Sequence, residues 1–184
     1  MKVQYFHTRE EWRQWLLEHF DKEREVWLTY PLVSSGERGI LYNDAVEEAL
    51  CFGWIDSTVK KLDGEHKIQR FTPRKPGSSY SQANKERLQR LIDRNRIHPS
   101  LMDEVKRVLS EAFLFPPDIM DAIEQAGALV NFEGFSDSYK RIRIAYIEGA
   151  RKRPEEFKKR LGHFIRKTKE GKMIAGYGGI ATYY

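Results

Sequence analysis

The segment from Arg70 to Asn84 gathers the side chains best suited to binding an anion. Arg70, Thr72 and Arg74 supply two guanidinium groups and a hydroxyl. Ser81 stands where a helix is expected to begin, so free backbone N–H groups and the positive end of the helix dipole would add to them. Such groups, when they converge, hold a phosphate or a carboxylate. The sequence therefore predicts an anion site in this segment.

The candidate ligand-binding set also takes in aromatic, acidic and amide side chains from the same region. Its members are Trp54, Asp56, Lys60, Arg70, Thr72, Arg74, Tyr80, Ser81 and Asn84. The alternative interpretation is structural: Arg70 pairs with a carboxylate such as Asp56 or Asp44, because an unpaired buried charge is costly. In that case Ser81 and Asn84 only cap and turn the chain.

Asp56 is the one candidate catalytic residue. A carboxylate beside Trp54 and Phe71 can be partly desolvated, which suits a general base. No partner for acid–base work is evident, because Lys60 lies about 13 Å further along the predicted strand. An enzyme that uses Asp56 with Arg70 and Arg74 on a phosphorylated or carboxylated small substrate is thus an alternative function, and a structural ion pair is the other reading of Asp56.

Residue types that bind metals are scattered. The five histidines, His7, His19, His66, His98 and His163, form no His-Glu-x-x-His motif, and Cys51 is the sole cysteine. No metal and no cofactor is expected, and Cys51 is interpreted as a small buried apolar residue. The run Gly176-Tyr177-Gly178-Gly179 neither follows a strand nor opens a helix, so it is not a dinucleotide-binding fingerprint.

The elements that position these residues follow from capping signals and hydrophobic spacing. Thr8 and Glu11 form a capping box that begins a helix with Trp12 and Leu16 on its apolar face. Residues 25–30 are rich in β-branched and aromatic side chains and predict a strand. A second helix is expected over 43–52, ended by Gly53.

A β-hairpin over residues 55–72 is the clearest supersecondary signal. Asp63-Gly64 suits a two-residue type I′ turn, which would pair Val59 with Ile68, Ser57 with Arg70 and Ile55 with Thr72. In this register Arg70 shares a face with Val59 and Ile68. It would therefore need an anionic or hydrogen-bonding partner.

Proline and serine signals after residue 76 predict a run of helices. Their expected first residues or caps are Ser81, Pro99, Pro117, Ser136 and Pro154. Few strands and many helices predict an α+β fold: a small antiparallel sheet with a central β-hairpin, packed by helices, and a helical C-terminal part. We expect one domain over 1–184, with an α+β portion over 1–76, a helical portion over 77–170 and a glycine-rich aromatic tail over 171–184.

Composition narrows the class of protein. Charged residues make up 32% and hydrophobic residues 40% of the 184 residues, which is typical of a folded chain. Neither a signal peptide nor a run long enough to span a membrane is evident, so a cytoplasmic location is expected. The net charge of +5 hides basic stretches over 58–76 and 140–172, the latter with 13 basic and 4 acidic residues. An anionic small molecule, an acidic partner or, with weaker support, nucleic acid could bind there.

The chain resembles a known family over most of its length. The resemblance is carried by the run Asp44–Ser57, by Lys60 and Asp63, by Arg70–Pro76, and by Ser79-Tyr80-Ser81 with Asn84. These residues are similar to the bacterial YdeI/OmpD-associated family, also described as bacteriocin-protection proteins. Ser57 stands where the family has glycine, and Tyr80 where it has tryptophan.

The resemblance implies a cytoplasmic bacterial protein linked with tolerance of bacteriocins or cationic antimicrobial peptides, and it implies no catalytic mechanism. Together with the residues above, it predicts a protein of the protection type that binds an anionic ligand or partner. A third reading is an oligomeric interaction protein, in which the uncharged tail packs on its own body or joins two copies.

Overall fold

The structure is a computed structural model that describes residues 2–176 and 180–184, and it divides into two compact units. The first unit comprises Met1–Tyr80 and Arg87–Leu109, and the second comprises Ser81–Glu86 and Ser110–Tyr184. The α+β class is confirmed, with the strands in the first unit and only helices in the second. The expectation of one domain over 1–184 stays a prediction.

The first unit contains a four-stranded sheet in the order β1-β2-β4-β3. The strands are β1 (Val3–Gln4), β2 (Val26–Pro31), β3 (Trp54–Lys61) and β4 (His66–Pro73). β1 runs parallel to β2, whereas the other neighbours are antiparallel, so the sheet is mixed and not antiparallel as predicted. A strand of two residues leaves no periodic signal in the sequence, and the helix between β1 and β2 allows the parallel return.

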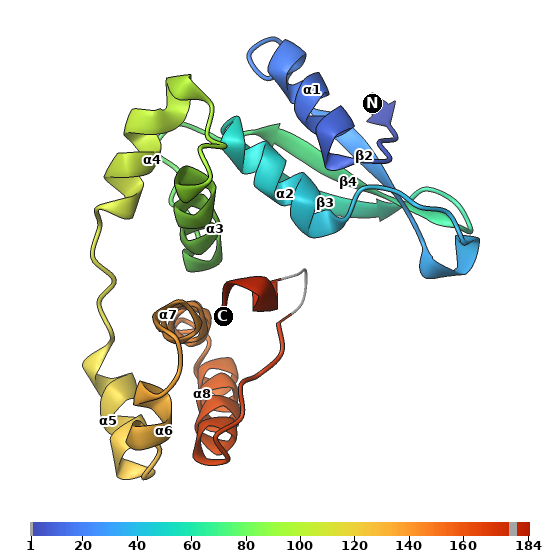
Figure 1. The fold of residues 1–184 in the computed structure, drawn as a ribbon. Coiled ribbons are helices and arrows are strands. Elements are labelled where there is room, and N and C mark those ends of the chain that lie inside the picture. The colour runs from blue at the N-terminus through green and yellow to red at the C-terminus, as the bar shows by residue number, and fades with distance from the viewer. Residues whose placement is uncertain (1, 177–179) are drawn as a thin grey trace. The chain divides into compact units, whose positions relative to one another are not determined.

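Two helices, α1 (Arg9–His19) and α2 (Tyr42–Cys51), pack on one face of this sheet (Figure 1). The predicted cap is confirmed, because Thr8 Oγ1 accepts a hydrogen bond from the Glu11 N–H at 3.2 Å. The Glu11 carboxylate accepts from the His7 N–H at 2.8 Å instead of completing the box at Thr8. Gly53 ends α2 with φ of 71°, as predicted.

The hairpin forms, but its predicted turn and register are wrong. Ile55 faces Thr72 as expected, yet Val59 faces Gln69 and not Ile68, because a bulge interrupts the ladder between Asp56 and Val59. The turn is wider than two residues: Asp63 Oδ1 accepts from the backbone N–H groups of residues 65 and 66, both at 2.8 Å. The bulge shifts Val59 by one residue, so it leaves the face that carries Ile68 and Arg70.

The remaining helices of the first unit follow β4. They are α3 (Gln82–Asp93), whose first turn belongs to the second unit, a 3-10 turn over Pro99–Leu101 and α4 (Met102–Leu109), while Val33–Ser35 form a further 3-10 turn after β2. Ser81 caps α3 as predicted, because its Oγ accepts from the Asn84 N–H at 3.3 Å.

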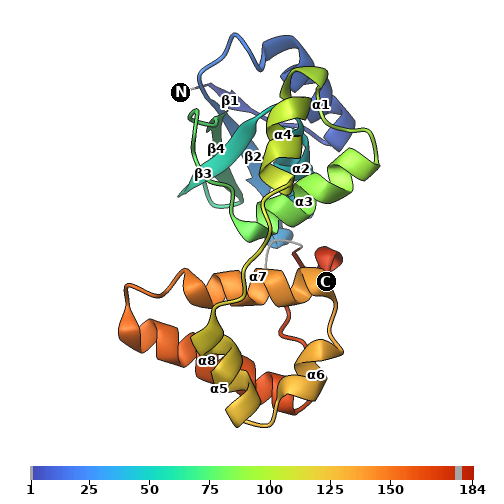
Figure 2. The ribbon, with the colours of Figure 1, turned by 90° about the vertical axis from the view of Figure 1, so that its left-hand side faces the viewer.

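The second unit is built from helices (Figure 2). These are α5 (Pro117–Gln125), α6 (Leu129–Glu133), α7 (Asp137–Glu148) and α8 (Pro154–Lys169), followed by a 3-10 turn over Ile180–Tyr183. The predicted helix starts at Pro117, Ser136 and Pro154 are confirmed. The five-residue α6 was not predicted. Across the described residues, every helix is too short or too polar to cross a membrane.

The described part of the C-terminal tail packs on its own unit. The Ile174 N–H donates to the Tyr139 hydroxyl at 2.9 Å, and the ring of Tyr184 lies edge-on to that of Tyr139, with centroids 4.7 Å apart. Tyr183 is buried. Tyr177, Gly178 and Gly179, part of the glycine run considered above, lie outside the described residues.

Candidate functional site

Arg70 forms a structural ion pair, but with a carboxylate that the sequence did not single out. Its Nε and Nη2 donate to Glu25 Oε2 at 2.7 and 2.6 Å. Neither Asp56 nor Asp44 is its partner, since Asp44 pairs with Arg9 at 3.1 Å. The Arg70 side chain is 39% exposed and that of Glu25 is 37% exposed. The pair therefore lies at the surface of the sheet.

Asp56 lies on the opposite face of the sheet from Arg70. It faces Phe71 in the ladder, and successive side chains of a strand point to opposite faces, so residue 70 points away from it. Asp56 Oδ2 accepts hydrogen bonds from the Tyr42 hydroxyl at 3.0 Å and from Gln69 Nε2 at 2.6 Å. The pairing of Asp56 with Arg70 on one substrate, as the enzyme alternative requires, has no geometric basis in this sheet.

Arg74 holds its own loop together. Its Nη2 donates to the carbonyl and hydroxyl oxygens of Ser78, each at 3.1 Å, and to the Ser79 carbonyl at 2.8 Å. The guanidinium lies 3.6 Å from the centroid of the Tyr80 ring, and the Tyr80 hydroxyl donates to Glu104 at 3.1 Å. Oxygens of Ser78 and Ser79 thus occupy Nη2, whereas Nε of Arg74 is buried without a hydrogen-bond partner.

The other predicted site residues have separate roles. Trp54 is buried and donates its indole N–H to the Phe20 carbonyl at 3.0 Å. The Lys60 ammonium lies 4.8 Å from the centroid of the Trp27 ring, and Thr72 pairs with Ile55 in the ladder. Ser81 and Asn84 belong to the second unit, where they form the cap of α3.

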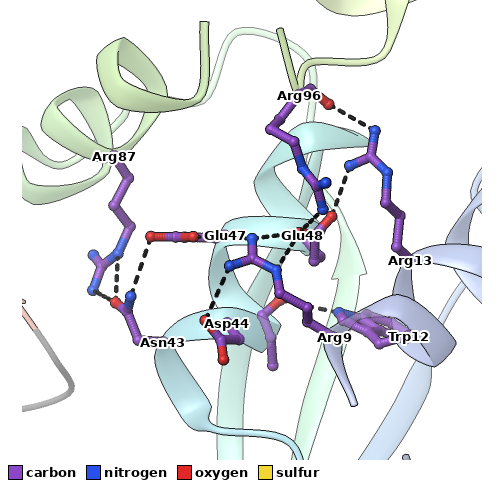
Figure 3. A network of polar contacts seen from close by, with 10 residues as sticks. Arg9, Trp12, Arg13, Asn43, Asp44, Glu47, Glu48, Arg87 and Arg96 are labelled. Carbon is purple, nitrogen blue, oxygen red and sulfur yellow. Dashed lines mark hydrogen bonds and ion pairs between the residues drawn. The ribbon is translucent and has the colours of Figure 1, made fainter. Parts of the chain in front are cut away.

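A network of charges that was not predicted ties α1, α2 and the segment after α3 together (Figure 3). Its centre is the carboxylate of Glu48, whose side chain is fully buried. Arg9 Nε and Arg96 Nη2 donate to Glu48 Oε1 at 2.8 and 2.6 Å, and Arg13 Nη1 donates to Oε2 at 2.7 Å. Burial pushes the pKa of Glu48 up, but the hydrogen bonds from these arginines outweigh it and leave the pKa below its usual range.

Three carboxylates face the three guanidinium groups around Glu48, since Arg9 also pairs with Asp44 and with Glu47, each at 3.1 Å. A fourth arginine, Arg87, belongs to the same network and donates to Asn43 Oδ1 at 3.0 Å. Cys51 lies beside it and is buried, as predicted. Burial raises the pKa of its thiol to about 12, which keeps the thiol protonated at neutral pH. This cluster therefore stabilises the first unit, because Arg9, Arg13 and Arg96 each have a carboxylate partner.

A cationic cavity lies in the second unit, between α7, α8 and the tail. Its volume is about 330 Å³, and its lining comprises Arg143, Tyr146, Ile147, Glu156, Lys159, Arg160, His163, Phe164, Ile174 and Ala175. A cavity of the first unit, about 360 Å³, is lined in contrast by the carboxylates of Glu37 and Asp63. Of the two, only the cavity of the second unit presents a cationic lining.

Within residues 2–176 and 180–184, the partners of Arg143 are neutral. Its Nη2 donates to the Ile174 carbonyl and to the Tyr184 hydroxyl, and its Nε is buried without a hydrogen-bond partner. Among the described residues no carboxylate pairs with Arg143 or with Lys159. Because a half-buried guanidinium loses much of its hydration, an unmatched positive charge at this position favours an anion.

The cavity also has polar groups on Arg160 and His163. Arg160 is neutralised by Glu156 at 2.7 Å, donates to the Tyr146 carbonyl at 2.7 Å and lies 3.8 Å from the centroid of the Tyr146 ring. His163 Nδ1 lies 3.0 Å from Arg166 Nη2 and must accept, because a guanidinium can only donate. Nε2 of a neutral His163 therefore carries the proton and is a donor.

The sequence drew attention to this region without identifying the site. The excess of basic residues over 140–172 marked the segment, and Lys159 was placed on a basic helical face. Arg143, Arg160 and His163 were not predicted as a group, because only the packing of α7 against α8 and the tail brings them together.

The fold and the site define an α+β protein whose helical unit carries a cationic cavity. The chain belongs to the family described as Domain of unknown function (DUF8412), whose model matches residues 4–104, more than half of the chain. Residues 112–171 match the family described as Bacteriocin-protection, YdeI or OmpD-Associated, which confirms the predicted resemblance. No curated protein and no solved structure matches the chain.

The two matches divide the chain in an unexpected way. The residues on which the resemblance was based, from Asp44 to Asn84, lie inside the match to the domain of unknown function. The protection-family match begins at residue 112 and contains α5 to α8. The cationic cavity has eight of its ten lining residues in that match, the exceptions being Ile174 and Ala175.

Proposed function

We propose that this chain is a cytoplasmic protein of the bacteriocin-protection type that acts by binding an anionic ligand in the cavity of the second unit. The protection-family match over 112–171 supports the type of protein. The cytoplasmic location is the expectation that the family resemblance carries. The ligand bears a phosphate or a carboxylate, since these groups suit a guanidinium, an ammonium and an imidazole N–H.

The single observation that carries the proposal is the unmatched charge of Arg143. In the same unit, Arg141 receives a carboxylate, because its Nε and Nη2 donate to the two oxygens of Glu86 at 2.7 and 2.9 Å. Arg160 receives Glu156. Arg143 and Lys159 line one cavity and form no ion pair with a carboxylate among the described residues, so an anion entering that cavity would meet two positive charges. Glu156 lines the same cavity and offsets part of the charge of Lys159, which helps to lower the pKa of this carboxyl.

Calorimetric titration of the full chain with inorganic phosphate tests the proposal. Replacing Lys159→Gln should weaken binding by about fivefold, or ~1 kcal/mol, because one partly solvated charge is lost. Lys158→Gln is the matched control: this neighbour is 74% exposed, pairs with Glu155 and does not line the cavity. Arg143 is less suitable for this test because it also holds the tail.

Equal binding by the native protein and both variants would refute the assignment of the cavity. Loss of binding in Arg74→Ala, with Lys159→Gln unaffected, would instead support the anion site predicted from the sequence around Arg70, Arg74 and Ser81. Repeating the titrations at two salt concentrations with short oligonucleotides separates nucleic acid, for which affinity should fall steeply with salt.

A further inference from the structure

The size and the lining of the cavity carry the proposed function further. Resting on that function, we infer that the cavity binds an organic anion in which a phosphate or carboxylate is attached directly to a small apolar body, such as an aromatic ring or a short alkyl chain. Arg143 and Lys159 bind the charged group, and Tyr146, Ile174 and Ala175 contact the apolar body.

The volume of the cavity exceeds what an inorganic anion needs. At about 330 Å³ the cavity has room for about eleven water molecules, taking about 30 Å³ for each. This volume is at the lower end of the range for small-molecule sites, roughly 300–1,000 Å³. A bare phosphate would leave most of the cavity to water, whereas a phosphate or carboxylate with a ring attached would fill more of it.

The lining of the cavity combines apolar and charged side chains. Tyr146 is 42% exposed, and Ala175 is exposed too, so both offer carbon surface to a ligand. Ile174 adds a partly buried aliphatic side chain, and Ile147 and Phe164 close the base of the cavity. Lys159 and His163 lie four residues apart on α8 and therefore share one face of that helix.

The apolar lining residues are also held in place. The Arg160 guanidinium covers one face of the Tyr146 ring at 3.8 Å. The backbone of Ile174 is fixed at both ends, since its N–H donates to the Tyr139 hydroxyl at 2.9 Å and its carbonyl accepts from Arg143. Binding to side chains that are already ordered costs little conformational entropy, and this favours an apolar group over water.

Charged and apolar lining residues are in direct contact, and this sets the geometry of the ligand. Arg143 donates to the carbonyl of Ile174, so the cation is in direct contact with the residue that contributes the apolar wall. A ligand that uses both must carry its anionic group next to its apolar body. A long polar linker between the two would move one of them out of the cavity.

Inorganic phosphate and phenyl phosphate are the probes that test this inference. We expect the native protein to bind phenyl phosphate about tenfold more tightly than phosphate, the gain from burying about two methylene-sized groups. Ala175→Gln, which places a polar side chain on the apolar wall, should bring this ratio close to one. Met173→Gln is the matched control, because Met173 is an exposed tail residue outside the lining and should keep the native ratio.

The outcomes separate the inference from the proposed function. A ratio near one in the native protein, with phosphate bound and weakened by Lys159→Gln, would overturn the organic anion and leave the anion site standing. A tenfold preference that Ala175→Gln does not change would also overturn the inference, because the apolar body would then bind elsewhere. If neither probe binds, the proposed function fails and the inference fails with it.

Discussion

In the first unit, three guanidinium groups converge on carboxylates, whereas in the second unit the described hydrogen bonds of Arg143 go to a carbonyl and a hydroxyl. Both sites are partly shielded from solvent, and both are rich in arginine. They differ in how the guanidinium groups are paired: Arg9, Arg13 and Arg96 each bind the carboxylate of Glu48, whereas among the described residues no carboxylate binds Arg143. A cluster of arginines therefore indicates an anionic ligand only where the arginines lack carboxylate partners within the protein.

The largest effect on stability is expected for the buried carboxylate of Glu48. Glu48→Gln should lower the free energy of unfolding by about 3 kcal/mol, because three guanidinium groups lose the buried anion that compensates them. Urea unfolding of the native protein and the variant measures this loss, and Glu18→Gln, on the exposed side of α1, is the control. Phosphate binding in the cavity should be unchanged. A loss below about 1 kcal/mol would mean that the ion pairs of Glu48 do not stabilise the first unit.

The stabilisation by Glu48 should disappear in acid. Its pKa in the folded state lies below its usual range, so its contribution is present above the unfolded-state value of about 4.3 and is lost as pH falls through the folded-state value. The difference in unfolding free energy between the native protein and Glu48→Gln should therefore shrink between about pH 5 and pH 3. A constant difference across this range would contradict the lowered pKa.

A smaller effect is expected at Arg74. Arg74→Ala should cost about 1 to 1.5 kcal/mol of stability, because the hydrogen bonds to Ser78 and Ser79 and the stacking on Tyr80 are lost. Thermal unfolding measures the cost. Affinity for phosphate should stay at the native value. This result would show that Arg74, like the arginines around Glu48, has a structural role.

The smallest effect is expected for the pair of Arg70 and Glu25. Since both side chains are more than one third exposed, a double-mutant cycle with Arg70→Gln and Glu25→Gln should give a coupling below about 1 kcal/mol. The coupling should fall further in high salt. A coupling of several kcal/mol would mean that this surface pair behaves like the buried cluster around Glu48.

Local signals in the sequence predicted the local structure well. The caps at Thr8, Ser81 and Ser136 and the stop at Gly53 were confirmed, because each depends on groups within a few residues. The hairpin turn failed for a similarly local reason. Asp63 uses its side chain to bind two backbone N–H groups, and that option competes with the two-residue turn that Asp-Gly also favours.

Long-range partners could not be read from the sequence. Arg70 was expected to need an anionic or hydrogen-bonding partner, and it has a carboxylate. That carboxylate, Glu25, is 45 residues away, and only the pairing of β2 with β4 brings the two together. The cavity residues come from α7, α8 and the tail, whose packing no periodic pattern specifies. The charge count marked the segment, and the missing carboxylate at Arg143 emerged only from the fold.

Helix α3 limits where the chain can be divided for separate expression of its parts. Its first turn, up to Glu86, belongs to the second unit, whereas its remainder, from Arg87, belongs to the first. The family matches invite a cut between residues 104 and 112. A fragment that starts there would lack Glu86 and leave the guanidinium of Arg141 without its carboxylate. The boundary between the two family matches is therefore a poor place for a truncation.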